Sequence, residues 1–157
     1  MVYEVGGCIV RSASLKDIEK IAEIERKSFE HPYPTTVFIS AIFLYPELFL
    51  VVECGGVVKG YITGFITTNN CCHVASIAVD PESRGVGLGK KLLSAFEERC
   101  LELKIKCLEL EVSVKNERAM KLYKKLGYKI VERLPDYYPD SDAYLMRKEA
   151  DLKRGPP

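Results

Sequence analysis

The stretch that decides the fold reads His73-Val-Ala-Ser-Ile-Ala-Val-Asp-Pro-Glu-Ser-Arg-Gly-Val-Gly-Leu-Gly-Lys90. Residues 73–80 predict a strand, which Pro81 closes. Gly85, Gly87 and Gly89 then form a turn, and residues 87–103 carry apolar side chains at helical spacing. The stretch therefore predicts a strand, a glycine-rich turn and a helix in direct succession.

This layout suits the binding of a phosphate or pyrophosphate group. A glycine turn at the start of a helix points several backbone N–H groups and the positive end of the helix dipole at one spot. Glycines let the backbone approach an anion closely, and Arg84 and Lys90 add positive charge. A plain glycine turn without a ligand is the less favoured alternative, because glycines at a helix start would weaken the helix for no return.

Two common phosphate-binding motifs do not fit the spacing. A Walker loop needs a glycine where Arg84 stands and a serine or threonine where Lys91 stands. A dinucleotide fingerprint counted from Gly85 needs its last glycine where Lys90 stands. The spacing therefore excludes a nucleotide-binding protein of either class.

Strands and helices alternate along the rest of the chain. Strands are predicted at residues 8–11, 48–53, 57–68, 106–114, 128–132 and 143–148. A first helix follows the cap Ser14, with Asp17 at the capping-box position and an apolar face of Leu15, Ile18, Ile21 and Ala22. Two more helices are predicted at residues 35–45 and, after the cap Asn116, up to residue 126. The order predicts an α/β (α+β) domain over residues 1–150, with a mixed sheet covered on both faces, and a disordered tail over residues 151–157.

Composition excludes several classes of protein and partner. The chain has 157 residues, of which 47% are hydrophobic, and this predicts one folded domain rather than disorder. A net charge of +1 gives no reason to expect nucleic acid or an anionic membrane as a partner. The sequence starts without a secretory segment, and its richest apolar run, 38–44, is too short to span a bilayer. We therefore expect a cytoplasmic protein.

The six cysteines are interpreted as small buried hydrophobic residues. No Cys-x-x-Cys pair occurs and no histidine lies at metal-ligand spacing from a cysteine, so a zinc site is not supported. Cys100 and Cys107 fall among leucine and isoleucine, where a thiol packs as a small apolar group. Structural disulfides are the alternative, which becomes favoured if the source is a hyperthermophile.

Two motifs resemble those of the GNAT superfamily of N-acetyltransferases. Arg84-Gly-Val-Gly-Leu-Gly89 matches its acetyl-CoA signature, Gln/Arg-x-x-Gly-x-Gly/Ala, and Asn116-Glu-Arg-Ala-Met-Lys-Leu-Tyr-Lys-Lys-Leu-Gly-Tyr128 looks like its second motif. The resemblance runs from Ile9 to Lys148. It implies a single GNAT-type domain with a mostly antiparallel sheet of about seven strands, splayed at its centre, and an enzyme that uses acetyl-CoA and no metal.

The resemblance also implies how acetyl-CoA is held. The amides of residues 85–90 would bind the pyrophosphate, and the pantetheine arm would lie along residues 77–79 like an extra strand, next to the splay. The cofactor-binding residues expected on this basis are Ile77, Ala78, Val79, Arg84, Gly85, Val86, Gly87, Leu88, Gly89, Lys90, Asn116 and Tyr123.

Three further segments look like the branch that acetylates protein N-termini, which includes RimI-like and archaeal enzymes. They are residues 73–79, residues 110–112, and Tyr137-Tyr138-Pro-Asp-Ser-Asp-Ala-Tyr144-Leu-Met-Arg147. In that branch, a hairpin and the loop after the first helix form a narrow slot, here expected from Phe29, Tyr33, Tyr137 and Tyr138. The slot admits a free N-terminus and excludes an internal lysine. An α-amine also needs less help from a base, because its pKa is about 8 and that of lysine about 10.4.

The resemblance assigns catalytic roles to four residues. Glu30 and His73 match the pair that archaeal members use as base through a water, and Glu111 matches the base of RimI-like enzymes. Tyr123 matches the general acid for the thiolate. Exposed carboxylates, an ordinary strand histidine and a core tyrosine are the structural alternatives. Alternation along the strand predicts one face for His73, Ala75, Ile77 and Val79, and another for Glu109 and Glu111, whose burial would raise a carboxylate pKa.

Other functions remain open. The same fold could acetylate an internal lysine, an antibiotic or another small amine, or serve as a non-catalytic acyl-CoA-binding module. The expected partners are protein N-termini, including those of ribosomal or nascent chains, with no nucleic acid and no membrane. The protein is expected to be a monomer, and an auxiliary subunit is left open.

Overall fold

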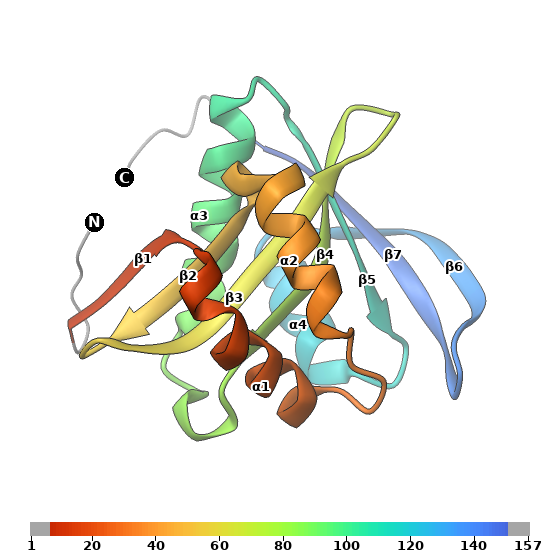
Figure 1. Cartoon of the computed structure of the whole chain (residues 1–157). Helices are drawn as coiled ribbons and strands as arrows, with labels where there is room; N and C mark the ends of the chain where they lie inside the picture. The colour runs from red at the N-terminus through yellow and green to blue at the C-terminus, as the bar shows by residue number, and fades with distance from the viewer. Residues whose placement is uncertain (1–6, 151–157) are drawn as a thin grey trace.

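Seven strands and four α-helices follow one another in the predicted order within residues 7–150, the part of the chain that this computed structural model describes (Figure 1). The strands are β1 (Cys8–Ser12), β2 (Phe49–Cys54), β3 (Val57–Ile66), β4 (Cys71–Val79), β5 (Cys107–Ser113), β6 (Lys129–Tyr138) and β7 (Ser141–Glu149). The helices are α1 (Ile18–Ser28), α2 (Thr35–Leu44), α3 (Leu88–Glu102) and α4 (Glu117–Lys125). The predicted tail, residues 151–157, lies outside the described residues.

The strands form one sheet in the order β1-β2-β3-β4-β5-β7-β6. Every neighbouring pair is antiparallel except β4 and β5, which are parallel. That parallel pairing covers only residues 71–74 of β4 and 107–110 of β5. On their outer edges, β4 stays paired with β3 as far as Val79, and β5 stays paired with β7 as far as Ser113. The two central strands therefore diverge after four pairs, and the predicted splay is confirmed.

A β-bulge lies where the divergence begins. Thr63 of β3 pairs with Ser76 and Gly64 pairs with Val74, so Ala75 is an extra residue in β4. Such a bulge bends its strand and increases the local twist. The bulge thus directs the second half of β4 away from β5.

The same bulge makes one prediction wrong. Residues that were expected to share a face, His73 with Ile77 and Val79, point to opposite sides of the sheet. Ile77 and Val79 pack against the core under α3, whereas His73 stacks on Phe65, which shares its face of β3 with Tyr61 in the core under α1 and α2. Strict alternation fails because one inserted residue reverses the order of faces.

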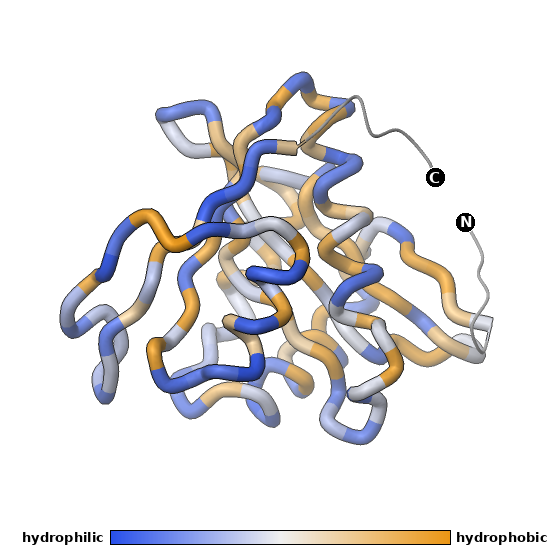
Figure 2. Tube along the Cα trace, turned by 180° about the vertical axis from the view of Figure 1, so that it is seen from behind, coloured by the Kyte–Doolittle hydropathy of each residue, from blue (hydrophilic) through white to orange (hydrophobic). Residues whose placement is uncertain are grey.

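Helices cover both faces of the sheet, as predicted. The core under α1 and α2 contains Ile21, Ile24 and Phe38, and the core under α3 contains Leu92 and Phe96. Figure 2 shows the hydrophobic segments mainly in the middle of the molecule and the hydrophilic segments mainly around its outside. None of the helices in residues 7–150 is long and apolar enough to cross a membrane.

The first helix begins later than the sequence predicts. The capping box is present, since the Ser14 N–H donates to Asp17 Oδ2 at 2.8 Å, but residues 15–17 form a 3-10 turn and the α-helix starts at Ile18. Leu15, which was expected on the buried face, is therefore 55% exposed. Side chains recur at a shorter period in a 3-10 turn, so the α-helical spacing does not apply to this residue.

Four of the six cysteines correct the sequence interpretation. Disulfides join Cys8 to Cys54 and Cys71 to Cys107, and each bond links residues that face each other on neighbouring strands. Their Cα atoms lie 4.1 Å and 4.5 Å apart, close enough for a disulfide. Cys72 and Cys100 are buried free thiols, as interpreted. Spacing along the chain could not reveal the bonds, because they depend on the register between strands.

We expect loss of the Cys71–Cys107 bond to destabilise the fold. The bond closes a loop with a sequence separation of 36, and a loop of this length contributes about 3–4 kcal/mol by restricting the unfolded chain. Urea denaturation of C71S/C107S should show a free energy of unfolding lower by about 3 kcal/mol. A variant with serine at all four bonded positions serves as the control. Because it has neither disulfide, dithiothreitol should not change its urea transition. Equal midpoints for wild type and C71S/C107S would contradict the prediction.

Candidate active site

The glycine turn between β4 and α3 has the geometry of an anion site. Gly85 and Gly87 have φ angles of 89° and 87°, which glycine adopts without strain. Gly87 is the N-cap of α3 and no side chain among residues 7–150 caps this end. The intrahelical ladder starts with the Lys91 N–H donating to the Gly87 carbonyl at 3.1 Å. The three preceding amides, 88–90, are therefore available to an anion.

Side chains around the turn divide into two groups. Arg84 donates from Nε to the Val79 carbonyl at 2.9 Å and from Nη2 to Ser28 Oγ at 3.0 Å, so it ties the turn to β4 and α1. Lys90 is exposed and Leu88 is buried in the core. Of the two charges that the sequence assigns to the anion site, the Arg84 side chain is thus held by protein contacts and Lys90 points to solvent.

The diverging strands supply a second feature that fits acetyl-CoA. Beyond Val74, the edge of β4 toward β5 has no strand partner, so its backbone can pair with an extended ligand. Asn116 stands just beyond β5 as the N-cap of α4, where its Oδ1 accepts from the Ala119 N–H at 3.1 Å. The residues expected to hold the pyrophosphate and the pantetheine arm therefore line one continuous stretch from β4 to α3.

His73 lies between two carboxylates on the α1–α2 side of the sheet. Its Nδ1 is 2.8 Å from Glu109 Oε1 and its Nε2 is 2.7 Å from Glu111 Oε1. The ring stacks on Phe65, with centroids 5.1 Å apart. An ionised carboxylate can only accept a hydrogen bond, so both ring nitrogens carry hydrogens or one carboxyl group is protonated. His73, Glu109 and Glu111 together therefore hold one proton more than a neutral imidazole between two ionised carboxylates.

The surroundings shift the pKa values of this cluster in opposite directions. Burial lowers the pKa of His73, but the hydrogen bonds and charges of Glu111 and Glu109 outweigh burial and raise it above its ordinary value. Burial raises the pKa of Glu109, but the bonds from His73 and Arg147 outweigh burial and hold it below its usual range. Burial therefore does not raise the pKa of Glu109, because His73 and Arg147 both bond its carboxylate.

Three predicted tyrosines gather around Glu111. Burial and then the Glu111 charge raise the pKa of Tyr137, and the same causes raise the pKa of Tyr138 to about 12. Burial, Glu25 and Glu111 raise the pKa of Tyr33. The rings of Tyr137 and Tyr138 meet edge to face at 4.9 Å. Although strand β6 was predicted to end at residue 132, it extends to Tyr138 and so carries this pair toward the site.

Tyr123 lies on α4, buried and packed edge to face on Tyr128 with centroids 6.0 Å apart. Burial, and then Tyr138, raise the pKa of Tyr123 to about 12, so its phenol is protonated at neutral pH. Tyr138 is within electrostatic reach of both Tyr123 and Glu111. A protonated phenol in this position is chemically suited to donate a proton to a leaving thiolate.

Phe29 and Glu30 occupy the loop after α1. Phe29 is the C-cap of that helix and is 41% exposed. Glu30 is exposed, and its carboxylate makes no hydrogen bond or ion pair with any residue in 7–150. The structure therefore brings His73 to Glu111, and it does not join Glu30 to either of them.

Sequence reasoning missed a buried carboxylate next to this loop. Glu25 Oε1 accepts from Ser76 Oγ at 2.9 Å and from the Tyr61 hydroxyl, and Oε2 accepts from the Tyr33 N–H at 3.0 Å. Glu25 therefore ties the loop to β3 and β4. The signal was present, because Glu25 follows Ile21 by four positions and interrupts the apolar stripe of α1 with a charge.

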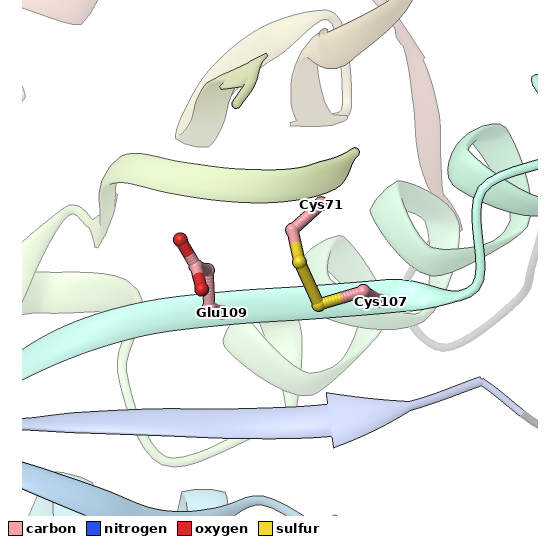
Figure 3. Close-up of side chains that lie close together, drawn as sticks. All are labelled: Cys71, Cys107 and Glu109. Carbon is pink, nitrogen blue, oxygen red and sulfur yellow. A yellow bond between two sulfur atoms is a disulfide. The ribbon is translucent and has the colours of Figure 1, made fainter. Parts of the chain in front are cut away.

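A further cluster lies beside the histidine. Atoms of Cys71, Cys107 and Glu109 of the types that ligate metals lie within 4.8 Å of one another (Figure 3). The figure shows the two sulfurs bonded to each other, with Glu109 on the same strand as Cys107. Metals take thiolate sulfur, so the cluster presents a disulfide and one carboxylate instead of two thiolate ligands.

The model of the acetyltransferase (GNAT) family matches residues 18–128. The chain belongs to the GNAT family. As a GNAT enzyme it is an N-acetyltransferase whose acetyl donor is acetyl-CoA, for which the α3 amides and the free edge of β4 fit the pyrophosphate and the pantetheine arm.

Relatives of this GNAT domain cover most of its length. It is 38% identical to an N-alpha-acetyltransferase of Sulfurisphaera tokodaii, with 87% of this chain and 90% of the relative covered. A candidate ribosomal protein bS18-alanine N-acetyltransferase of Bacillus subtilis is 36% identical over 87% and 92% of the two chains. The crystal structure of Ard1 from Thermoplasma volcanium is similar at a TM-score of 0.89 and 33% identity, over 94% of this chain and 99% of that one.

We expect Gly87→Ala to weaken acetyl-CoA binding about tenfold, because the left-handed backbone costs a side chain roughly 1–2 kcal/mol and the turn must approach the pyrophosphate closely. Gly56→Ala is the matched control, since Gly56 has a similar φ of 82° in the turn between β2 and β3. Titration calorimetry with acetyl-CoA should separate the two variants. Equal affinities in both would contradict the anion site.

Proposed function

We propose that this GNAT enzyme transfers an acetyl group from acetyl-CoA to the free α-amine of protein N-termini. The observation that carries the proposal is the contact of His73 Nε2 with Glu111 Oε1 at 2.7 Å, with Tyr33, Tyr137 and Tyr138 within electrostatic reach of that carboxylate. Two relatives at 36–38% identity are named as an N-alpha-acetyltransferase and as a candidate ribosomal protein bS18-alanine N-acetyltransferase. We propose that an extended chain with a free amine at its tip lies between these tyrosines, which come from the loop after α1 and from β6.

The proposed reaction is direct attack of the amine on the thioester. His73 and Glu111 together accept the proton that the amine loses, since they are the hydrogen-bonded pair in the slot. Tyr123, protonated at neutral pH, gives a proton to the thiolate that leaves. A backbone N–H near Val79 stabilises the oxyanion. Glu30 is the second candidate for the base, acting through a water.

An α-amine suits this proton acceptor. Its pKa is about 8, so a useful fraction is neutral at physiological pH, whereas lysine at about 10.4 is almost fully charged. The His73–Glu111 pair then removes a proton only after the amine has begun to bond to the carbonyl carbon. A modest base is sufficient for that step.

The proposed partners are N-termini of ribosomal or nascent proteins, and the enzyme is proposed to act as a monomer. The name of the Bacillus relative, which refers to ribosomal protein bS18, supports the first point. Such substrates are made in the cytoplasm, which is the proposed location of the enzyme. Disulfides are rare in cytosolic proteins of mesophiles and common in those of hyperthermophiles. A cytoplasmic protein with two disulfides is therefore expected in a hyperthermophile.

We expect turnover only with peptides that have a free N-terminus. The test measures thiol release from acetyl-CoA with short peptides starting Ser, Ala, Met-Leu and Met-Glu, and with N-blocked peptides that carry one lysine. Turnover with the free N-termini alone supports the proposal and reveals the preferred first residues. Turnover with lysine alone would move the acceptor to a side-chain amine, and none with either class would indicate a small-molecule acceptor or a non-catalytic module.

We expect three variants to separate the catalytic roles. Glu111→Gln and Tyr123→Phe should each lower kcat about 100-fold without abolishing acetyl-CoA binding, because each removes a proton-transfer group. Glu30→Ala should lower kcat less, since Glu30 lies outside the hydrogen-bonded cluster. Wild-type rates in both Glu111→Gln and Tyr123→Phe would refute these roles.

The wild-type kcat should rise with pH through an apparent pKa above 6.5, because the raised pKa of His73 delays loss of its proton.

A further inference from the structure

Two residues outside the proposed catalytic set complete a row of alternating charges across three strands. Arg147 of β7 donates from Nη2 to Glu109 Oε2 at 3.0 Å, and Glu109 Oε1 lies 2.8 Å from His73 Nδ1. His73 Nε2 then reaches Glu111 Oε1 at 2.7 Å. Glu109 faces His73 on one side and Arg147 on the other in the register of the sheet, so the backbone pairing itself aligns the row.

The donor is determined for two of the three bonds in this row, those that Glu109 accepts. Ionised carboxylates only accept, and the Arg147 guanidinium only donates, so Arg147 fixes Glu109 as an ionised acceptor. Glu109 in turn requires a hydrogen on His73 Nδ1. Nε2 is then the nitrogen that gains and loses the proton shared with Glu111, the carboxylate whose charge reaches Tyr33, Tyr137 and Tyr138.

We propose that Glu109, held by Arg147, is a positioning residue that keeps the hydrogen of His73 on Nδ1 and so directs the basic Nε2 toward Glu111 and the acceptor amine. The inference rests on the proposed function, because it assumes that His73 and Glu111 accept the amine proton. During the reaction the amine proton moves to Nε2 and is later lost to solvent, and the Nδ1 hydrogen stays in place.

Loss of Glu109 would reverse the tautomer. A neutral His73 without a carboxylate at Nδ1 would place its single hydrogen on Nε2, where Glu111 accepts it. The basic nitrogen would then be Nδ1, which lies on the side of residue 109, away from Glu111. The chemistry explains why a carboxylate that does not touch the substrate should control turnover.

The two positioning residues should shift the titration of His73 in opposite directions. Glu109→Gln removes a negative charge from Nδ1, so His73 loses its proton at lower pH. Arg147→Met removes the cation that competes for Glu109, so His73 keeps its proton to higher pH. General damage to the site would move both variants the same way.

The groups that face the His73 imidazole come from three strands. They are Glu109 and Glu111 of β5, the uncharged Phe65 of β3, and Cys71 of its own strand, which is in a disulfide and does not titrate. Beyond these carboxylates lie Arg147 on β7 and the tyrosines Tyr33, Tyr137 and Tyr138. The tyrosines stay neutral across the range in which histidine titrates, because their pKa values are all raised.

The chain is well suited to a direct measurement, since it contains only two histidines. In the full-length protein with labelled histidine, nitrogen chemical shifts report both the titration midpoint and the tautomer of His73, and the exposed His31 is an internal reference. We expect the Nδ1–H tautomer in wild type, a lower midpoint and the Nε2–H tautomer in Glu109→Gln, and a higher midpoint in Arg147→Met. The His31 signals should be the same in all of them.

Control variants and activity complete the test. Arg99→Met removes an equal charge from α3, where the Arg99 guanidinium donates to the Glu47 carbonyl and to Ser12 Oγ, and it should leave His73 unchanged. Glu109→Gln should lower kcat about tenfold with the peptide KM little changed, and Arg147→Lys should retain most of kcat. If Glu109→Gln does not fold, the Arg147 variants still give the sign of the shift.

Two results would overturn the proposal: a His73 midpoint that stays the same in both variants, or shifts in the same direction in both. The chemical shifts require no substrate, so they are independent of the proposed acceptor. Opposite shifts in a protein that acetylates no N-terminus would uphold the positioning pair and refute the proposed function. Turnover of N-terminal peptides without opposite shifts would do the reverse.

Discussion

The site depends on one limited contact, the parallel pairing of β4 with β5 over four residue pairs. If the pairing continued, hydrogen bonds between the strands would close the space in which acetyl-CoA must lie; if it were absent, His73 would not meet the carboxylates of β5. The bulge at Ala75 ends the pairing at this point and bends β4 away. The half of the sheet that is paired therefore builds the proton acceptor, and the half that is splayed receives the cofactor.

Register connects the disulfide to the chemistry. Cys71 faces Cys107, and two residues further along the same strands His73 faces Glu109. Residues two apart in a strand lie on one face, so the disulfide and the imidazole–carboxylate contact share both a face and a register. A slip of one residue would turn every side chain of the strand over. The covalent bond thus fixes the alignment on which the weaker hydrogen bonds of His73 depend.

What the sequence reveals, and what it does not, follows from the range of each interaction. The order of elements, the glycine turn and the cap Asn116 arise from residues close in the chain, and they were predicted correctly. The bulge, both disulfides and the bond between Arg147 and Glu109 arise from pairing between distant strands, which periodicity does not encode. The role of Glu30 likewise rests on its match to a catalytic position in the sequence, whereas the hydrogen bonds of this site join His73 to Glu111.

Burial of Glu25 explains how the two walls of the proposed slot stay in register with the base. One wall, the loop of Tyr33, is bonded through Glu25 to Ser76 of β4, the strand that carries His73. The other wall, the hairpin of Tyr137 and Tyr138, is continuous with β7, which pairs with the strand of Glu111. A buried carboxylate is stable only when its oxygens are hydrogen-bonded, and Glu25 has three donors from three different segments. Movement of the loop would cost Glu25 the Tyr33 N–H at Oε2, so the position of this wall is tied to the same sheet that sets the position of the proton acceptor.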